Sequence, residues 1–227
     1  MIIFEETMIV NVVEAGRIKI NINLPFDSVT IQIMNKAANF ISIIGHPLLT
    51  FPLFILIVMF GFKGFPEASL VSALIIGGVF IPLTVWMYSK SKNGSYTNFD
   101  VSDRIQRKSL FLFVIPLLVV VTVVLFATNQ SRNLCISVLL ALVLTVISQL
   151  VNFYVKSSLH VSLNIYLAAL VFMVNVEIAI VVLLFTGLLS WSRVKLGRHT
   201  VKEVLFGLSI GTVMSLIMLV SEGFIKI

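Results

Sequence analysis

The chain has 227 residues, of which 59% are hydrophobic and only 11% are charged, and its formal net charge is +6. This composition excludes an ordinary soluble domain, because a soluble core of this size needs far fewer apolar residues. Several apolar runs reach the roughly 20 residues that a helix needs to cross a hydrocarbon layer, and they are too continuous for alternating barrel strands. We therefore expect an all-α integral membrane protein, a bundle of six to seven transmembrane helices with a polar site at one membrane face.

In chain order, residues 1–43 are of mixed polarity and are predicted to form an N-terminal extramembrane segment. Alternation within residues 10–23 predicts a short strand pair or an irregular extension, followed by a surface helix. Residues 44–227 form the predicted transmembrane domain. Its spans are expected near residues 44–62, 69–89, 109–127, 133–155, 160–175, 178–191 and 204–224.

The fifth and sixth spans form one apolar stretch, residues 161–189. As a single helix it would run roughly 45 Å and overshoot the hydrocarbon core. A hairpin is therefore predicted, with its turn near Asn175 and Glu177, since a carboxylate at the bilayer centre is costly.

With this topology, the N-terminus and segments 90–108, 156–160 and 192–203 emerge on one face. Of the sixteen Lys and Arg residues, only Lys63, Arg132 and Lys226 lie on the opposite face. The positive-inside rule predicts that the crowded face is cytoplasmic. The rule also counts cations that are expected to bind phosphate. When Arg104, Arg107 and Arg193 are left out for this reason, ten Lys and Arg residues still lie on the crowded face. We expect a protein of the cell (inner) membrane whose site opens to the cytoplasm.

Three segments rich in Arg, Lys and His converge on this face, namely residues 100–108, 156–160 and 192–203. Each lies where a loop leads into a helix. A site that moves a phosphoryl group needs such a set, because fixed cations and helix N-terminal amides stabilise the charge on the phosphoryl oxygens. These segments therefore favour phosphate chemistry.

The last segment reads Ser192-Arg193, five residues, His199, three residues and Glu203. His199 and Glu203 are four apart, so on a helix the carboxylate can orient the imidazole. The pattern resembles the SR-x5-H-x3-D motif of the type 2 phosphatidic acid phosphatase family. The resemblance implies that His199 is a nucleophile that forms a phosphohistidine, with Glu203 in the place of the motif's Asp. It also implies that Arg193 clamps phosphate oxygens.

The middle segment, Ser157-Ser158-Leu159-His160, resembles the family's PSGH motif at two of four positions. By that resemblance His160 protonates the leaving alkoxide as general acid, and Ser158 donates a hydrogen bond to phosphate. Leu159 replaces a glycine, which puts a close backbone contact there in question.

The family's K-x6-RP motif has no counterpart, because the chain contains no Arg-Pro pair. Arg104 and Arg107 are the natural substitutes, and Lys108 and Lys156 are further predicted phosphate ligands. The resemblance covers about residues 90–215.

The expected function is metal-independent hydrolysis of a phosphate monoester or diphosphate on a lipid through a phosphohistidine. No cofactor and no nucleic-acid partner are expected. The expected partners are a phospholipid or polyprenyl phosphate substrate and membrane lipids. The oligomeric state stays open. One alternative is a catalytically silent relative that binds anionic lipids. Another is an intramembrane prenyltransferase that uses magnesium, although the chain has only the three Asp residues Asp27, Asp100 and Asp103.

Several of these residues also have purely structural interpretations. Thr200-x-x-Glu203 before an apolar run is a helix capping box, and Asp103 is expected as a helix N-cap with Asp100 exposed. His46 is expected as an interface anchor at the start of the first span.

Two further groups also have structural interpretations. Arg198 is expected to act as a topology determinant or a contact to anionic lipid. Gly207 and Gly211 predict close helix packing in the last span.

Overall fold

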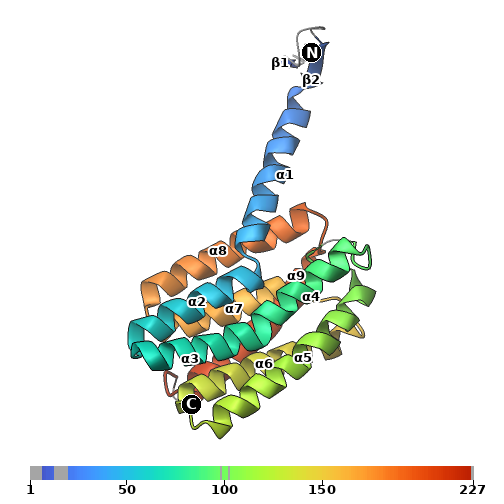
Figure 1. The fold of residues 1–227 in the computed structure, drawn as a ribbon. Coiled ribbons are helices and arrows are strands. Elements are labelled where there is room, and N and C mark those ends of the chain that lie inside the picture. The colour runs from blue at the N-terminus through green and yellow to red at the C-terminus, as the bar shows by residue number, and fades with distance from the viewer. Residues whose placement is uncertain (1–6, 13–19, 98, 102, 226–227) are drawn as a thin grey trace.

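The computed structural model covers residues 1–227 and describes all of them except 1–6, 13–19, 98, 102 and 226–227. The N-terminal part is an antiparallel hairpin of β1 (Thr7–Val12) and β2 (Ile20–Pro25), followed by α1 (Phe26–Ile44). The predicted strand pair before a helix is therefore confirmed. Figure 1 shows α1 carrying this hairpin away from the helical bundle.

The last half of α1 anchors the N-terminal part to the bundle. Residues 31–37 of α1 are exposed, whereas Ala38 and Ser42 are buried. Ser192 Oγ, on another helix of the bundle, donates a 2.5 Å hydrogen bond to the Ala38 carbonyl oxygen. Together with hydrogen bonds to Asn39 and Ser42, this contact holds the last turns of α1 against the bundle.

The bundle consists of apolar helices whose connections are short except for the one between Lys92 and Arg104. Their bounds are α2 Pro47–Phe62, α3 Phe65–Ile75, η1 Ile76–Phe80, α4 Ile81–Lys92, α5 Arg104–Ala127, α6 Arg132–Asn152, α7 Leu159–Phe172, α8 Val176–Lys195 and α9 Val201–Ser221. Within the described residues, five helical segments are long and apolar enough to cross a membrane, and there are six if α1 from Thr30 onward and α2, which meet at a 45° bend, count as one broken span. The prediction of an all-α membrane protein is confirmed, while the count of six to seven spans stays a prediction.

The segment predicted at 69–89 is a longer unit, Phe65–Lys92, in which α3, η1 and α4 are continuous. Its middle, η1, is a π-helical turn just before Pro82. Proline lacks an amide hydrogen and its ring crowds the carbonyl four residues earlier, so the preceding turn widens. The widened turn brings Val79 and Phe80 to the wall of an internal cavity.

The predicted hairpin is confirmed, because α7 ends at Phe172 and α8 begins at Val176. Asn175 caps α8 by accepting a 2.8 Å hydrogen bond from the Ile178 amide. The short helix α7 is largely buried among its neighbours, so it has little contact with lipid.

Close packing of α7 against α9 is also confirmed. A Cβ atom on Gly211 would lie 2.7 Å from the Ser162 carbonyl oxygen, which is closer than real Cβ atoms approach backbone. Only glycine permits this separation of the two helices. In consequence, the start of α7 lies directly beside the start of α9.

Candidate functional site

The end of α8 explains the six-residue spacing between Arg193 and His199. Gly197 has a left-handed φ of 64°, and its amide donates to Val194 O, while the Arg198 amide donates to Arg193 O. This is a Schellman ending, in which glycine reverses the chain without strain. The His199 amide then also donates to Arg193 O at 3.1 Å, so His199 returns beside the buried Arg193.

The ring of His199 is held in one tautomer by two neighbours. Glu203 Oε2 lies 2.9 Å from Nδ1, and Arg107 Nη2 lies 3.1 Å from Nε2. A carboxylate can only accept and a guanidinium can only donate, so Nδ1 carries the hydrogen and Nε2 presents its lone pair. Burial, and then the charges of Arg107 and Arg193, lower the pKa of His199 well below its usual range. His199 is therefore a neutral imidazole whose Nε2 electron pair accepts a hydrogen bond from Arg107.

The sequence left two interpretations of Glu203 open, a helix capping box and orientation of the His199 imidazole, and the contacts of Glu203 fit both. It forms a capping box with Thr200, whose Oγ1 accepts a 3.3 Å hydrogen bond from the Glu203 amide. The same carboxylate accepts from the Thr200 amide at 3.2 Å and contacts His199. Capping and imidazole orientation are thus performed by one side chain.

Asp100 is at the centre of the cluster, which overturns the expectation that it is exposed. Its side chain is only 8% exposed, and its Oδ2 accepts hydrogen bonds from Nη1 of both Arg193 and Arg198. Arg198, which was expected as a topology determinant or a lipid contact, also forms an ion pair with Asp100. Burial by itself would raise the pKa of Asp100, but His160 and the two guanidinium groups hold it below its usual range. Asp100 is an anion.

Two histidines approach the other oxygen of Asp100. His160 Nε2 lies 3.0 Å and His46 Nε2 lies 3.4 Å from Asp100 Oδ1, and the two imidazole rings meet edge to face. His46 was expected to be an interface anchor, but it belongs to this cluster. Asp103, by contrast, is the predicted N-cap, since its Oδ1 accepts from the Ile105 and Gln106 amides.

Ser158 and Lys156 complete the polar surface. Ser158 is fully buried, its amide donates to Glu203 O at 3.0 Å, and its hydroxyl has no partner among the described residues. Lys156 Nζ donates a 2.6 Å bond to Arg198 O and lies 3.6 Å from Glu203 Oε2. Both predicted phosphate ligands therefore lie beside the His199 and Glu203 pair.

Two other predicted phosphate ligands lie outside the cluster. Arg104 donates a 2.8 Å hydrogen bond from Nε to the Asn152 carbonyl oxygen and a second one to Phe153 O, at the end of α6. Lys108 is exposed and its Nζ lies 5.7 Å from the centre of the Phe153 ring. Among the described residues of the first segment, only Arg107 forms a hydrogen bond with His199.

His46, Asp100 and His160 offer three ligand atoms within 4.8 Å of one another, a spacing that could hold a metal ion. The hydrogen positions argue against it. His46 Nδ1 accepts a 3.2 Å bond from the Leu48 amide, so in the neutral ring Nε2 carries the hydrogen and has no lone pair for a metal. The guanidinium groups on Asp100 further disfavour a dication. The residues fit an anion better than a metal.

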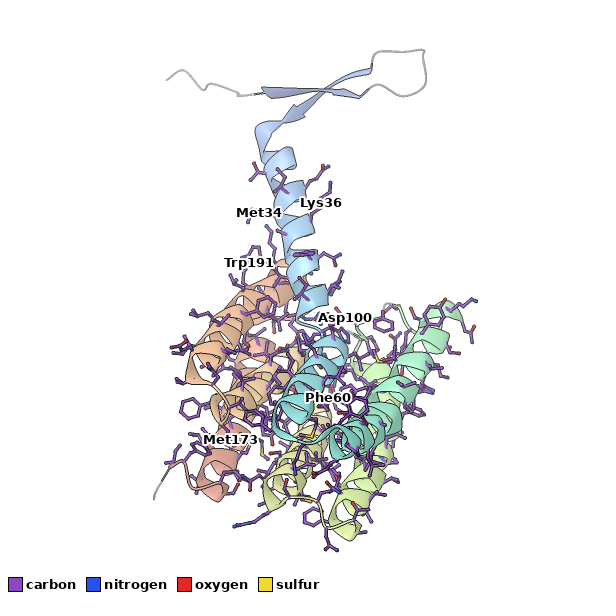
Figure 2. All side chains as sticks on the ribbon, turned by 60° about the vertical axis from the view of Figure 1, so that its left-hand side comes forward. Met34, Lys36, Phe60, Asp100, Met173 and Trp191 are labelled. Atoms are coloured by element: carbon purple, nitrogen blue, oxygen red, sulfur yellow. The ribbon has the colours of Figure 1, made fainter. Side chains whose placement is uncertain are left out.

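The cluster adjoins two pockets. One is a cavity of about 120 Å³ that His46, Asp100, Arg107 and His160 reach. The rest of its wall comes from α2, η1, α4, α5, α6 and α7 and is apolar except for Thr145. The other is a more open pocket of about 460 Å³ that Arg198 and Ser42 help to line. His46 and Asp100 line both. In Figure 2, Asp100 lies at the end of the bundle where α1 enters.

The sequence contains weak signals for His46 and Asp100, whose place in the cluster was not predicted. His46, His160 and His199 are the three histidines of the chain, and all were predicted on the cation-rich face. Asp100 is one of three aspartates and lies on the same face. A carboxylate and three imidazoles among cations, at one membrane boundary, favour a shared cluster. No protein-family model, curated protein or solved structure matches this chain.

Proposed function

We propose that the protein is a membrane-embedded, metal-independent lipid phosphatase that hydrolyses a phosphate monoester or diphosphate headgroup through a phosphohistidine on His199. One observation carries the proposal. His199 is a buried neutral imidazole whose Nδ1 hydrogen is held by Glu203, whereas its Nε2 lone pair faces a group of cations. That arrangement suits attack on phosphorus.

The charge balance of the cluster supports a phosphate ligand. Four cations, namely Arg107, Lys156, Arg193 and Arg198, outnumber the carboxylates of Asp100 and Glu203 in these contacts. Two positive charges therefore remain for a ligand, which matches a phosphate monoester dianion. Guanidinium groups in a buried site stabilise the charge of the phosphoryl oxygens more than they would in water.

The proposed reaction has two displacements. His199 Nε2 attacks phosphorus and forms a nitrogen–phosphorus bond while the bond to the lipid oxygen breaks. In this step His160 acts as an imidazolium, which gives one proton to the leaving alkoxide and becomes a neutral imidazole. Water then attacks the phosphohistidine, giving a proton to His160, and the nitrogen–phosphorus bond breaks to release inorganic phosphate. Arg107 must leave Nε2 in the first step. It can then donate to a phosphoryl oxygen, where its positive charge stabilises the developing negative charge.

The substrate is proposed to be a lipid because the cluster meets an apolar cavity inside a membrane bundle. The polar residues His46, Asp100, Arg107 and His160 line that cavity, and apart from Thr145 the other lining side chains are aliphatic or aromatic. A phospholipid or polyprenyl phosphate has the same division between headgroup and chain.

The orientation proposed is that the site opens to the cytoplasm, from the cation distribution in the loops. Ser95 lies in an exposed loop on the site side. In a Cys135→Ser background, a Ser95→Cys variant should resist an impermeant thiol reagent added to intact cells and react after lysis. Labelling in intact cells would place the site outside.

A second candidate, anionic-lipid binding without catalysis, is favoured by one contact: Arg107 covers the Nε2 atom that must attack. Phosphate release separates the two functions. Detergent-purified protein is incubated with phosphatidic acid, phosphatidylglycerol phosphate or a polyprenyl diphosphate, with and without vanadate. Hydrolysis predicts vanadate-sensitive release that His199→Ala abolishes, while the exposed Lys202→Ala leaves it unchanged. Release that survives His199→Ala would refute the nucleophile.

A further inference from the structure

The carboxylate of Asp100 is held as a bound anion would be. Its two oxygens contact Arg193, Arg198, His160 and His46, which come from α8, the loop after α8, α7 and the N-cap of α2. These residues lie up to about 150 positions apart in the chain. A side chain that only stabilised one loop would need fewer such partners.

The donors around Asp100 exceed what a carboxylate can satisfy. Arg193 is fully buried, yet its Nε and Nη2 have no hydrogen-bond partner among the described residues, and the Ser158 hydroxyl also lacks one. Buried donors without partners are costly, so their retention calls for an explanation. A phosphate monoester brings three terminal oxygens where Asp100 brings two, and could engage donors that Asp100 leaves free.

The backbone next to Asp100 is strained. Val101 is a fully buried β-branched residue with a left-handed φ of 46°, and its carbonyl oxygen accepts a 3.1 Å bond from Arg107 Nε. Such a residue in the left-handed region costs energy that the surrounding contacts must offset. Arg107 links the same segment to His199.

We propose that Asp100 occupies the phosphate-binding site as an internal carboxylate and makes the site selective for dianionic phosphate monoesters over monoanionic phosphodiesters. This inference rests on the proposed phosphate site. A phosphodiester carries the same single negative charge as the Asp100 carboxylate. Because Asp100 is tethered beside the site, its effective concentration there is higher than that of a free diester, so the diester cannot displace it. A dianion carries twice the charge and displaces it. Ordinary diester phospholipids, which surround the protein in large excess, are thereby kept out of a cationic site.

The test compares the binding of inorganic phosphate and dimethyl phosphate at pH 8 to the purified full chain in phosphate-free detergent, by calorimetry. Wild type should prefer inorganic phosphate, and Asp100→Asn should bind dimethyl phosphate about tenfold more tightly than wild type does, because one like charge is removed. Asp103→Asn is the matched control, since asparagine also caps helices, and it should bind like wild type. Equal or weaker binding of both ligands by Asp100→Asn would overturn the inference and make Asp100 a positioning residue.

A second measurement uses wild type alone, in case Asp100→Asn does not fold. Hydrogen–deuterium exchange of the peptide around residues 96–101 should increase when inorganic phosphate binds, because Asp100 leaves its partners. Decreased or unchanged exchange with bound phosphate would contradict displacement. Neither the binding measurement nor the exchange measurement requires catalytic turnover. If the protein shows this selectivity but releases no phosphate from lipids, the proposed hydrolysis is disproved and the inference about Asp100 still holds.

Discussion

Gly207 lies against Ser158 so closely that a Cβ atom on Gly207 would stand 2.5 Å from the Ser158 carbonyl oxygen. The Ser158 amide also donates to the Glu203 carbonyl oxygen, one turn earlier on α9. These two contacts join the segment that carries His160 to the segment that carries His199. A glycine one turn beyond the motif therefore sets the distance between the proposed acid and the proposed nucleophile.

We expect Gly207→Ala to destabilise the protein and to reduce phosphate release. The atoms nearest to the added methyl group belong to the Ser158 backbone, which cannot rotate away, so α7 and α9 must separate and move His160 from His199. The matched control is Gly61→Ala in α2, where nothing lies within 4 Å of the added methyl group. Thermal unfolding in detergent should show a lower midpoint for Gly207→Ala only. A wild-type midpoint and rate for Gly207→Ala would show that the close packing is dispensable.

Glu203→Gln separates the two roles of Glu203. Glutamine retains the capping box, so the free energy of unfolding should change by less than about 1 kcal/mol. The neutral amide cannot hold the imidazole of His199 with the same charge, so phosphate release should fall about tenfold or more. Unfolding curves and initial rates measure the two effects separately. An unchanged rate would leave capping as the sole role.

Arg107→Ala and Arg104→Ala form a matched pair on the first turn of α5. Arg107 contacts His199, so its removal should lower the rate by about 10²-fold to 10³-fold. Arg104 binds carbonyl oxygens at the end of α6, so its removal should cost about 1 kcal/mol of stability with little change in rate. Rates are compared per folded protein after size-exclusion chromatography. Equal loss of activity in both variants would contradict the assignment.

The first-turn arginines also show what the sequence could predict. The spacing of His199 and Glu203 and the turn at Asn175 follow from local periodicity, which one sequence displays. Which of Arg104 and Arg107 faces the site depends on the rotation of α5 against its neighbours, which periodicity leaves open when both lie on one helix face. Asp100 and His46 were misassigned because their partners come from distant segments, and only the tertiary fold brings them together.

The pKa of His199, lowered mainly by burial and then by Arg107, predicts an unusual pH profile. A free histidine is half protonated near its ordinary pKa of about 6.5. His199 should instead stay neutral as pH falls from 8 to 5, so nucleophile protonation should cause no loss of rate there. Unfolded His199 does bind a proton below pH about 6.5, so its contribution to stability becomes less favourable as the solution is acidified.

Nitrogen-15 spectra of the three histidine rings measure this directly. The His199 signals, assigned by their loss in His199→Asn, should keep the positions of a neutral ring with hydrogen on Nδ1 from pH 8 to pH 5. A titration of those signals with a midpoint near the ordinary histidine value would contradict the buried, cation-flanked environment.

The most direct test of the proposed function is capture of the covalent intermediate. Purified protein is mixed with a lipid phosphate monoester labelled with phosphorus-32, quenched within one turnover and digested. We predict an acid-labile, base-stable label on the peptide that contains His199, and none in His199→Asn. Release of phosphate by wild type without such a label, or a label that persists in His199→Asn, would contradict the central claim.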